Sequence, residues 1–326
     1  MSRKGWALFV ALCFIWGIPY LLIRVAVREL SAPELVFLRT APAALLLAPF
    51  AFGGGALAPL LARWRWVLAY TLVELAVPWL LLSHAEQRIS SSLAGLLVAT
   101  VPLIAVLVYR AAGVAEHVDA RRLTGLVVGF VGVAALVGLD LGRSDPAAMA
   151  EVIGVACCYA IGPLIVSRHL HGLPSLAVVA ASLVVTATIY AVPGLLDPPR
   201  SLAAATLGAV AILALVCTAL AFVIFFALIR EVGPARSTVI TYVNPLVAVL
   251  LGVVLLGEPF TTGIAVGMPL ILIGSVLGTA PSLRQTERAR TQSATAARIT
   301  SHGAAGGAAD GAAEGNKAAR APTPVP

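Results

Sequence analysis

Long apolar runs alternate with short polar stretches along the chain, from its amino terminus to about residue 280. A helix rises about 1.5 Å per residue, so about 20 apolar residues cross a hydrocarbon core about 30 Å thick. Each run therefore predicts one transmembrane helix, because the runs are too long and too continuous for the alternating strands of a barrel. The ten predicted spans are residues 5–23, 33–52, 66–85, 90–109, 122–139, 150–167, 174–195, 205–228, 236–256 and 262–280.

Composition supports this pattern. Of the 326 residues, 60% are hydrophobic and only 11% are charged, whereas a soluble domain carries about a quarter charged residues. The expected fold class is an all-α integral membrane protein in the lipid bilayer of a cell membrane, plasma or inner. The net charge of +7 does not predict nucleic-acid binding, because the basic residues are scattered over short loops and a tail.

The two ends of the chain differ from the apolar runs. Arg3 and Lys4 precede an apolar stretch as in a signal peptide, but that stretch reaches Ile23 without a small-residue cleavage site, which favours a retained first span. Residues 283–326 lack hydrophobic periodicity and predict a disordered tail. Ten basic residues lie on the side of the amino terminus and six more in the tail, against six elsewhere, so both termini are predicted to be cytoplasmic.

The two halves of the chain resemble each other. Pro19 precedes Arg24 by five residues at the end of the first span, and Pro163 precedes Arg168 in the same way at the end of the sixth. The further matches, which keep the same order at offsets of 138 to 143, are Pro102 with Pro245, Glu116 with Glu258, Gly125 with Gly263, and Gly129 with Gly267. Several matches in order predict a duplicated unit of five spans, with repeats at 5–139 and 150–280.

Five is an odd number, so the second copy enters the membrane from the opposite side. Two copies related in this way form an inverted repeat, the plan of many secondary transporters, in which alternating access opens a midplane site to either side. The sequence thus predicts ten helices as two inverted five-helix repeats, and a secondary transporter with a small-molecule substrate.

Several motifs resemble EamA-type members of the drug/metabolite transporter superfamily. They are Phe14-Ile15-Trp16-Gly17, Phe37-Leu38-Arg39, Pro102, Pro245 and Gly257-Glu258-Pro259, within a resemblance that covers about residues 5 to 280. The resemblance implies that the first four helices of each half surround a cavity and that the fifth and tenth stand aside, which leaves a homodimer open. It also implies export or exchange of small metabolites or drugs. Ala160 stands where Trp16 stands in the first half, so the two halves of the cavity are expected to differ.

Glu74 is the sharpest candidate for a functional group. It lies near the middle of the third span, where an ionised carboxylate is costly unless it is paired, hydrated or protonated. Tyr70 and Pro78 share its helix face, and Pro78 has no N–H to offer the Glu74 carbonyl. These features suit a proton-coupling or cation-recognising group. The alternative is a structural carboxylate bonded to another helix, with Arg39 as a partner.

Arg39 lies about six residues inside the second span. It can bind an anionic group, pair with Glu74, or extend to the membrane surface, and the sequence leaves all three readings open.

Interrupted helices in corresponding positions of the two halves indicate a midplane site. The candidate helix breaks or hinges are Gly17, Pro19, Pro78, Pro102, Gly162, Pro163 and Pro245. The side chains expected to line the site are Trp16, Tyr20, Tyr159, Tyr242 and Asn244. The aromatic rings could stack on a ring or a cationic amine, and Asn244 could bond substrate or a freed carbonyl. The alternative is that these residues only kink and fill the bundle.

Three further features are expected to serve the framework. The spacing of Gly125 and Gly129, and of Gly263 and Gly267, predicts close packing faces that could also form a dimer seam. Glu116 and Glu258 are expected to cap the helices that follow them. His84, Glu86 and Arg88 cluster at the outer end of the third span, either as solvated groups or as a vestibule gate.

Motifs for catalysis are missing from the sequence. It contains no P-loop, no His-Glu-x-x-His or Gly-x-Ser-x-Gly motif, and no zinc spacing. We therefore expect no catalytic residues, metal or cofactor, and a transporter rather than an enzyme. The alternatives are a non-transporting membrane scaffold or sensor and, further from the pattern, an intramembrane enzyme that modifies lipids.

Overall fold

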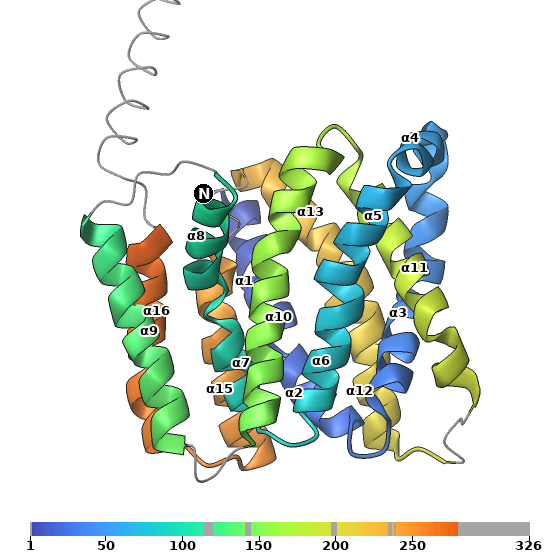
Figure 1. Cartoon of the computed structure of the whole chain (residues 1–326). Helices are drawn as coiled ribbons and strands as arrows, with labels where there is room; N and C mark the ends of the chain where they lie inside the picture. The colour runs from blue at the N-terminus through green and yellow to red at the C-terminus, as the bar shows by residue number, and fades with distance from the viewer. Residues whose placement is uncertain are drawn as a thin grey trace, which may run out of the picture. The chain divides into compact units, whose positions relative to one another are not determined.

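The apolar runs of the sequence all contain helices in the computed structural model (Figure 1). The structure describes residues 2–113, 120–140, 145–196, 201–233, 237 and 239–279. Within these residues, eight helical stretches are long and apolar enough to cross a membrane, and Ile240–Leu256 and Thr262–Leu277 are shorter apolar helices. All regular elements in this part of the chain are helical, which confirms the all-α membrane fold. The predicted tail and Glu116 lie outside the described residues.

The first half opens with a span made of two helices. Ile18 alone separates them, at the point where Gly17 precedes a proline. The elements of this half are α1 (Arg3–Gly17), α2 (Pro19–Ala26), α3 (Ala32–Ala51), η1 (Gly53–Gly55), α4 (Leu57–Ala62), α5 (Trp64–Thr71), η2 (Leu72–Ala76), α6 (Val77–Ala85), α7 (Ser91–Val98), α8 (Val101–Ala111) and α9 (Ala120–Asp140). Local signals define the helix starts; at α3, the Ser31 backbone N–H donates to the Glu34 carboxylate in a capping box.

The second half opens with α10, which begins after Asp145. The Asp145 carboxylate accepts hydrogen bonds from the backbone N–H groups of Ala147 and Ala148, and Pro146 occupies the first helical position. The elements of this half are α10 (Pro146–Ile165), η3 (Val166–Leu170), α11 (Ser175–Leu196), α12 (Ala204–Ala214), η4 (Leu215–Leu220), α13 (Ala221–Val232), α15 (Ile240–Leu256) and α16 (Thr262–Thr279).

The third and eighth spans are each interrupted by a π-helical turn at the same place in the repeat. These turns, η2 and η4, begin 143 residues apart, at Leu72 and Leu215. Pro78, in the helix α6 that follows the first turn, has no N–H to donate. In the second turn the Thr218 hydroxyl donates to the Leu213 carbonyl at 2.8 Å. A wider turn leaves carbonyls free for other partners and is often found at functional sites. At this offset of 143 residues, Glu74 of the first repeat corresponds to Cys217 of the second.

The two halves run in opposite directions. α1 begins at the end of the bundle where α13 finishes, since the Ser2 hydroxyl donates to Glu231 at 2.5 Å; we call this the amino-terminal end. α10 begins at the other end, the distal end, where Arg88 lies 2.9 Å from Asp145 (Figure 1). The helices that open the two repeats therefore point in opposite directions, as an inverted repeat requires.

The last helices of the two repeats, α9 and α16, pack along each other at one side of the bundle (Figure 1). Their contact is so close that a side chain on Gly274 would collide with the backbone of Gly129. Leu270 fills the space beside Gly132, and Leu136 fills that beside Gly267. The predicted packing faces are therefore used within the chain, where the two repeats cover these glycines mutually.

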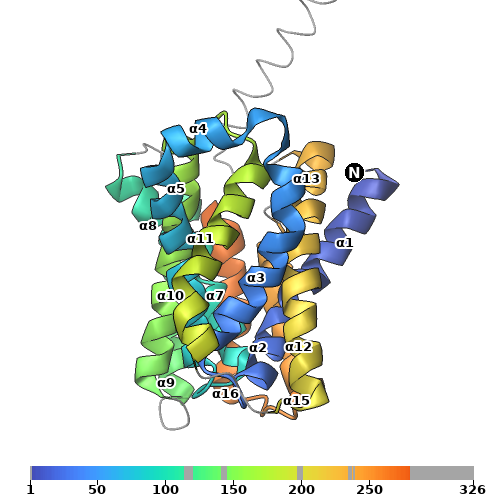
Figure 2. The same cartoon turned by 90° about the vertical axis from the view of Figure 1, so that its right-hand side faces the viewer.

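The helices α3 and α11 pack along each other on the side away from α9 and α16 (Figures 1 and 2). Between these pairs, one buried cluster draws on both repeats and includes Leu22, Leu96, Val152 and Leu213. The two repeats thus share a core, which includes Tyr20 and has Tyr159 packed against it.

Candidate functional site

Glu74 lies in the π-helical turn η2 and faces the second repeat. Its carboxyl group rests against the backbone of α10 at Gly162, so closely that any side chain at that position would collide with it. The Glu74 Oε2 atom is buried and has no hydrogen-bond partner among the described residues. A central carboxyl group from one repeat thus meets a glycine that the sequence had marked as a break in the other repeat.

The turn that carries Glu74 is held by α11. The Tyr190 hydroxyl donates to the Ala76 carbonyl at 2.9 Å, and the hydroxyl groups of Thr71 and Ser182 lie 2.9 Å apart. These bonds give partners to polar groups at a place where the regular helical pairing is interrupted. The carboxyl group is therefore presented from a fixed backbone rather than from a mobile loop.

Arg39 is buried inside the bundle, with 7% of its surface exposed. Its Nε–H donates to the Thr218 hydroxyl of η4 at 3.0 Å, and its guanidinium carbon lies 3.8 Å from the centre of the Trp79 ring. The side chain does not extend to the membrane surface. Glu74 and Arg39 form no ion pair, although both are described, and the binding of an anionic group by Arg39 stays a prediction.

Trp79 joins the candidates, although the sequence analysis did not single it out. It lies on α6 under Arg39, and its side chain interacts with the Tyr159 hydroxyl of α10. Tyr159 is close enough to Glu74 and Arg39 to interact electrostatically with both. The usable sequence signal was a tryptophan in the middle of a span, since tryptophan in membrane proteins is enriched at the interfaces, matched by Phe222 at an offset of 143.

The other predicted aromatic residues divide into two groups. Tyr20 is buried and lies within electrostatic reach of Arg39 and Tyr159, so it belongs to the same region. Trp16 instead packs on α13, with ring centres 4.8 Å from Phe225 and 6.1 Å from Phe222. Its ring fills the contact between two helices, which is the structural alternative considered for it.

Tyr242 and Asn244 lie on α15 and bond neighbouring helices. The Tyr242 hydroxyl donates to the Ser275 carbonyl of α16 at 3.4 Å. With its amide nitrogen turned toward α1, Asn244 donates to the carbonyls of Ile240 at 3.0 Å and Cys13 at 3.2 Å. Asn244 therefore bonds backbone carbonyls of its own helix and of α1, and these contacts do not bring it to Glu74.

The predicted helix breaks have unequal outcomes. Gly17 and Pro19 flank a helix boundary, Pro78 follows a π-helical turn, and Pro102 starts α8 after a break at Ala99 and Thr100. Gly162, Pro163 and Pro245 instead lie inside the continuous helices α10 and α15. A transmembrane helix tolerates such a proline where neighbouring helices supply partners. At Gly162 the absence of a side chain leaves room for the Glu74 carboxyl group.

The sequence matches the EamA-like transporter family over residues 3–138 and 147–279. This chain belongs to the EamA-like transporter family. The two matched segments are tandem copies of the EamA domain, as the resemblance implied, and the chain is a multi-pass membrane transporter.

Relatives of this EamA protein carry the same general description. A protein of Escherichia coli strain K12 described as the uncharacterized inner membrane transporter YedA is 32% identical over 259 residues, which is 77% of this chain and 82% of that protein. An uncharacterized transporter of Archaeoglobus fulgidus is 24% identical over 83% of this chain and 97% of its own length. A crystal structure with 20% identity matches the fold with a TM-score of 0.57, over 86% of this chain and 97% of the other.

At the distal end of this EamA protein, charged side chains join the two repeats. Arg88 lies 2.9 Å from Asp145 and 2.5 Å from Glu151, and His84 lies 3.0 Å from Glu151. The cluster of Arg88, His84, Asp145 and Glu151, here called the distal ion cluster, is partly exposed.

Glu86, expected beside His84 and Arg88, is instead fully buried. Glu258 also differs from expectation, because it caps α7 rather than the helix that follows it.

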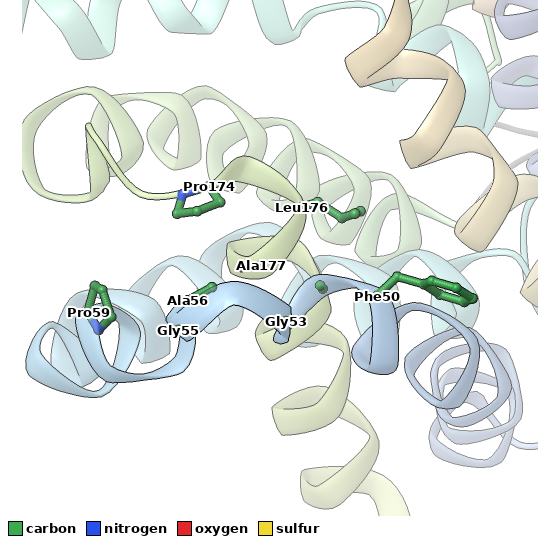
Figure 3. Close-up of a pocket in the computed structure, with 9 residues that line it drawn as sticks. Phe50, Gly53, Gly55, Ala56, Pro59, Pro174, Leu176 and Ala177 are labelled. Carbon is green, nitrogen blue, oxygen red and sulfur yellow. The ribbon is translucent and has the colours of Figure 1, made fainter.

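A cavity of about 410 Å³ lies away from these groups, between the end of α3, the segment through η1 and α4, and the start of α11 (Figure 3). Its lining is Phe50, Ala51, Gly53, Gly55, Ala56, Pro59, Pro174, Leu176 and Ala177. The side chains of these residues carry no polar group, so the cavity offers no chemistry for a charged solute. The candidate site remains the region of Glu74, Arg39, Trp79 and Tyr159.

Proposed function

We propose that this EamA-like transporter exports or exchanges a small organic solute by alternating access, and that Glu74 couples the movement to protons. The observation that carries the proposal is the Glu74 carboxyl group, whose buried Oε2 atom lacks a hydrogen-bond partner among the described residues and which lies against α10 of the other repeat. A carboxyl group in this position is satisfied by a proton or by a cationic group of a solute. Exchange of these two occupants is what proton coupling requires.

The neighbours of Glu74 support a site for polar organic molecules. Arg39 presents a guanidinium group with no carboxylate bound to it among the described residues, and Trp79 and Tyr159 provide flat apolar surfaces with polar edges. Such rings bind a solute by stacking, while the charged groups fix its orientation. Because Glu74 comes from one repeat and Tyr159 from the other, relative movement of the repeats alters the site.

Contacts between the repeats at both ends of the bundle support alternating access. At the distal end they are those of the distal ion cluster. At the amino-terminal end, Arg63 donates to the carbonyls of His169 and His171 at 3.2 and 2.8 Å, and Arg168 donates to that of Ala112 at 2.6 Å. Breaking one set while keeping the other would open the site to one side at a time.

The proposal is tested with the purified full chain. Thermal-shift screening of amino acids, nucleosides, amines and drugs identifies solutes that stabilise the protein, because a ligand that binds the folded state raises its stability. Liposomes that contain the protein are then loaded with such a solute, and the uptake of a labelled copy is measured. Counterflow above that of protein-free liposomes supports transport. Stabilising solutes that show no counterflow, or that are chemically converted, contradict it.

A further inference from the structure

Glu86 is a second buried carboxyl group, at the distal end of the bundle. It follows α6 directly and is 0% exposed, and neither carboxyl oxygen has a hydrogen-bond partner among the described residues. Its neighbours His84 and Arg88 point to the surface and belong to the distal ion cluster. The buried carboxyl group therefore takes no part in that cluster, and the role proposed for Glu74 does not use it.

Charged and titratable groups of three other elements lie within electrostatic reach of Glu86. Arg24 and Tyr20 come from α2, Arg39 comes from α3, and Glu258 comes from the segment between α15 and α16. The Arg24 guanidinium donates to the backbone carbonyl of Glu86, not to its carboxyl group. Glu86 is thus near two cations, forms an ion pair with neither, and lies beside another carboxylate.

The start of α7, a helix end that would stabilise an ionised carboxylate, is already occupied. α7 begins five residues after Glu86, and its first N–H groups would favour an anion. Glu258 of the second repeat binds there and accepts four hydrogen bonds from Ser91 and Ser92. The backbone N–H groups lie at 2.7 and 2.9 Å, and the hydroxyls at 2.9 and 2.5 Å. An ionised Glu86 would therefore be an unpaired charge next to Glu258.

We propose that Glu86 is a proton-binding site, and that its proton stabilises the contact between Glu258 and the start of α7 that joins the two repeats. When the carboxyl group takes up a proton it becomes neutral and no longer repels Glu258. When it releases the proton to water, its negative charge repels the carboxylate of Glu258 and weakens that contact. Burial and, after it, the charge of Glu258 raise the pKa of Glu86 well above its usual range, against the smaller effects of Arg24 and Arg39.

A proton at Glu86 would give the protein a second protonatable group, near the distal end rather than at the centre. A role of this group in transport rests on the proposed function, whereas proton binding by Glu86 does not depend on it. The two can therefore fail separately.

The experiment is infrared spectroscopy of the carbonyl band of protonated carboxyl groups, recorded on the purified full chain across pH. All samples carry Glu74→Gln, which removes the other carboxyl group that, among the described residues, has a buried oxygen atom without a hydrogen-bond partner. Glu86→Gln is compared with Glu29→Gln. Glu29 is an exposed carboxylate at the distal end that accepts a hydrogen bond from the Ala203 N–H at 2.9 Å, so it serves as the matched control.

We expect a band of protonated carboxyl at neutral pH that is lost as the pH rises. Glu86→Gln should remove it, and Glu29→Gln should leave it in place. If Glu86→Gln does not fold, Glu258→Gln gives a second reading, because removal of the neighbouring charge should move the loss of the band to lower pH. The proposal is overturned by a band that Glu86→Gln or Glu258→Gln leaves unchanged, by the absence of a band at neutral pH, or by a band that appears only without sodium, which would indicate a cation site.

Discussion

Gly162 and Glu74 show how one residue can decide the position of another in a distant part of the chain. Glycine in a helix is unfavourable by about 1 kcal/mol relative to alanine, so its presence in α10 calls for a reason. The reason is space, since the Glu74 carboxyl group occupies the position that a Cβ atom would take. The same residue that the sequence marks as a weak point of a helix is thus the surface that receives the central carboxyl group.

Gly162→Ala tests this contact. The added methyl group overlaps the Glu74 carboxyl group and should lower the stability of the protein by about 1–3 kcal/mol, the usual cost of overpacking. Gly154→Ala is the matched control on the same helix, because its methyl group would meet only Leu81 at an ordinary distance of 3.6 Å. Thermal unfolding in detergent measures both variants. Adding Glu74→Ala should restore the loss; an equal effect of the two glycine substitutions would contradict the contact.

Thr218 provides a second residue-scale prediction. Its hydroxyl accepts from Arg39 Nε at 3.0 Å, so Thr218→Val leaves a buried guanidinium N–H without a partner and should cost about 1–3 kcal/mol of stability. Thr188→Val is the control, because the exposed Thr188 hydroxyl bonds only the Val184 carbonyl of its own helix. Chemical denaturation of the two variants measures the difference. Similar losses in both would show that the Arg39 contact contributes nothing.

The sequence identifies polar residues whose burial in lipid costs free energy. It identifies less clearly those residues whose role depends on contacts between helices. Glu74 is visible in the sequence because a carboxylate interrupts an apolar run. Trp79 gives a weaker signal, a tryptophan inside a span, because its place in the site depends on Arg39 lying over its ring and on Tyr159 from another helix. Asn244 looks like a substrate ligand in the sequence, but in the fold it serves a carbonyl of α1.

At the scale of the elements, the repeat is clearest in the π-helical turns η2 and η4. Both turns begin at a Leu-Val pair, and their positions differ by 143 residues. They carry different groups, since Glu74 is replaced by Cys217 in the second copy and Leu75 by Thr218. The two turns thus have the same shape and different chemistry. The first presents a carboxyl group, that of Glu74, and the second presents a hydroxyl, that of Thr218, which binds Arg39.

The prolines show why only some of the predicted helix breaks are breaks in the structure. Pro102 begins a new helix, whereas its counterpart Pro245 lies within α15 without a break. The residue removes one hydrogen bond in both places, but neighbouring helices decide whether the chain bends. At the break before Pro102, the Ser275 hydroxyl donates to the freed Ala99 carbonyl at 3.2 Å.

The distal ion cluster yields a prediction at the element scale. Arg88→Ala removes the contacts to Asp145 and Glu151 and should loosen the distal end of α10. Spin labels on cysteines at positions 87 and 147, in a chain without its native cysteines, should then report a longer or broader distance. Arg28→Ala is the control, since Arg28 is an exposed arginine after α2. An unchanged distance in Arg88→Ala would mean that the cluster does not join the repeats.

The same spin-labelled pair gives a pH dependence. The Ala147 backbone N–H foremost, with smaller effects of Ala148 and Arg88, holds the pKa of Asp145 below its usual value of about 3.9. Its stabilising effect is therefore present above that value and is lost as the pH falls through the lowered pKa. The distance should stay constant as the pH falls to about 4 and increase only below it. Loosening that begins well above the usual carboxyl range would contradict this account.

At the scale of the whole molecule, the inverted repeat supports the proposed position of the site. The odd number of spans in each copy was readable from the sequence, and the opposite directions of α1 and α10 agree with it (Figure 1). The pairing of α9 with α16 was not readable in detail, because glycine spacing indicates a close contact without naming its partner. Contacts between the repeats at both ends leave the central region as the place where a solute can be enclosed.

The central claim is that Glu74 couples protons to the movement of a solute. It is tested most directly by uptake of the identified solute into liposomes under an imposed pH gradient, comparing the native chain, Glu74→Gln and the control Glu29→Gln. The claim predicts that Glu74→Gln folds with unchanged thermal stability but loses uptake driven by the pH gradient, while Glu29→Gln retains it. Full gradient-driven uptake by Glu74→Gln would contradict the claim.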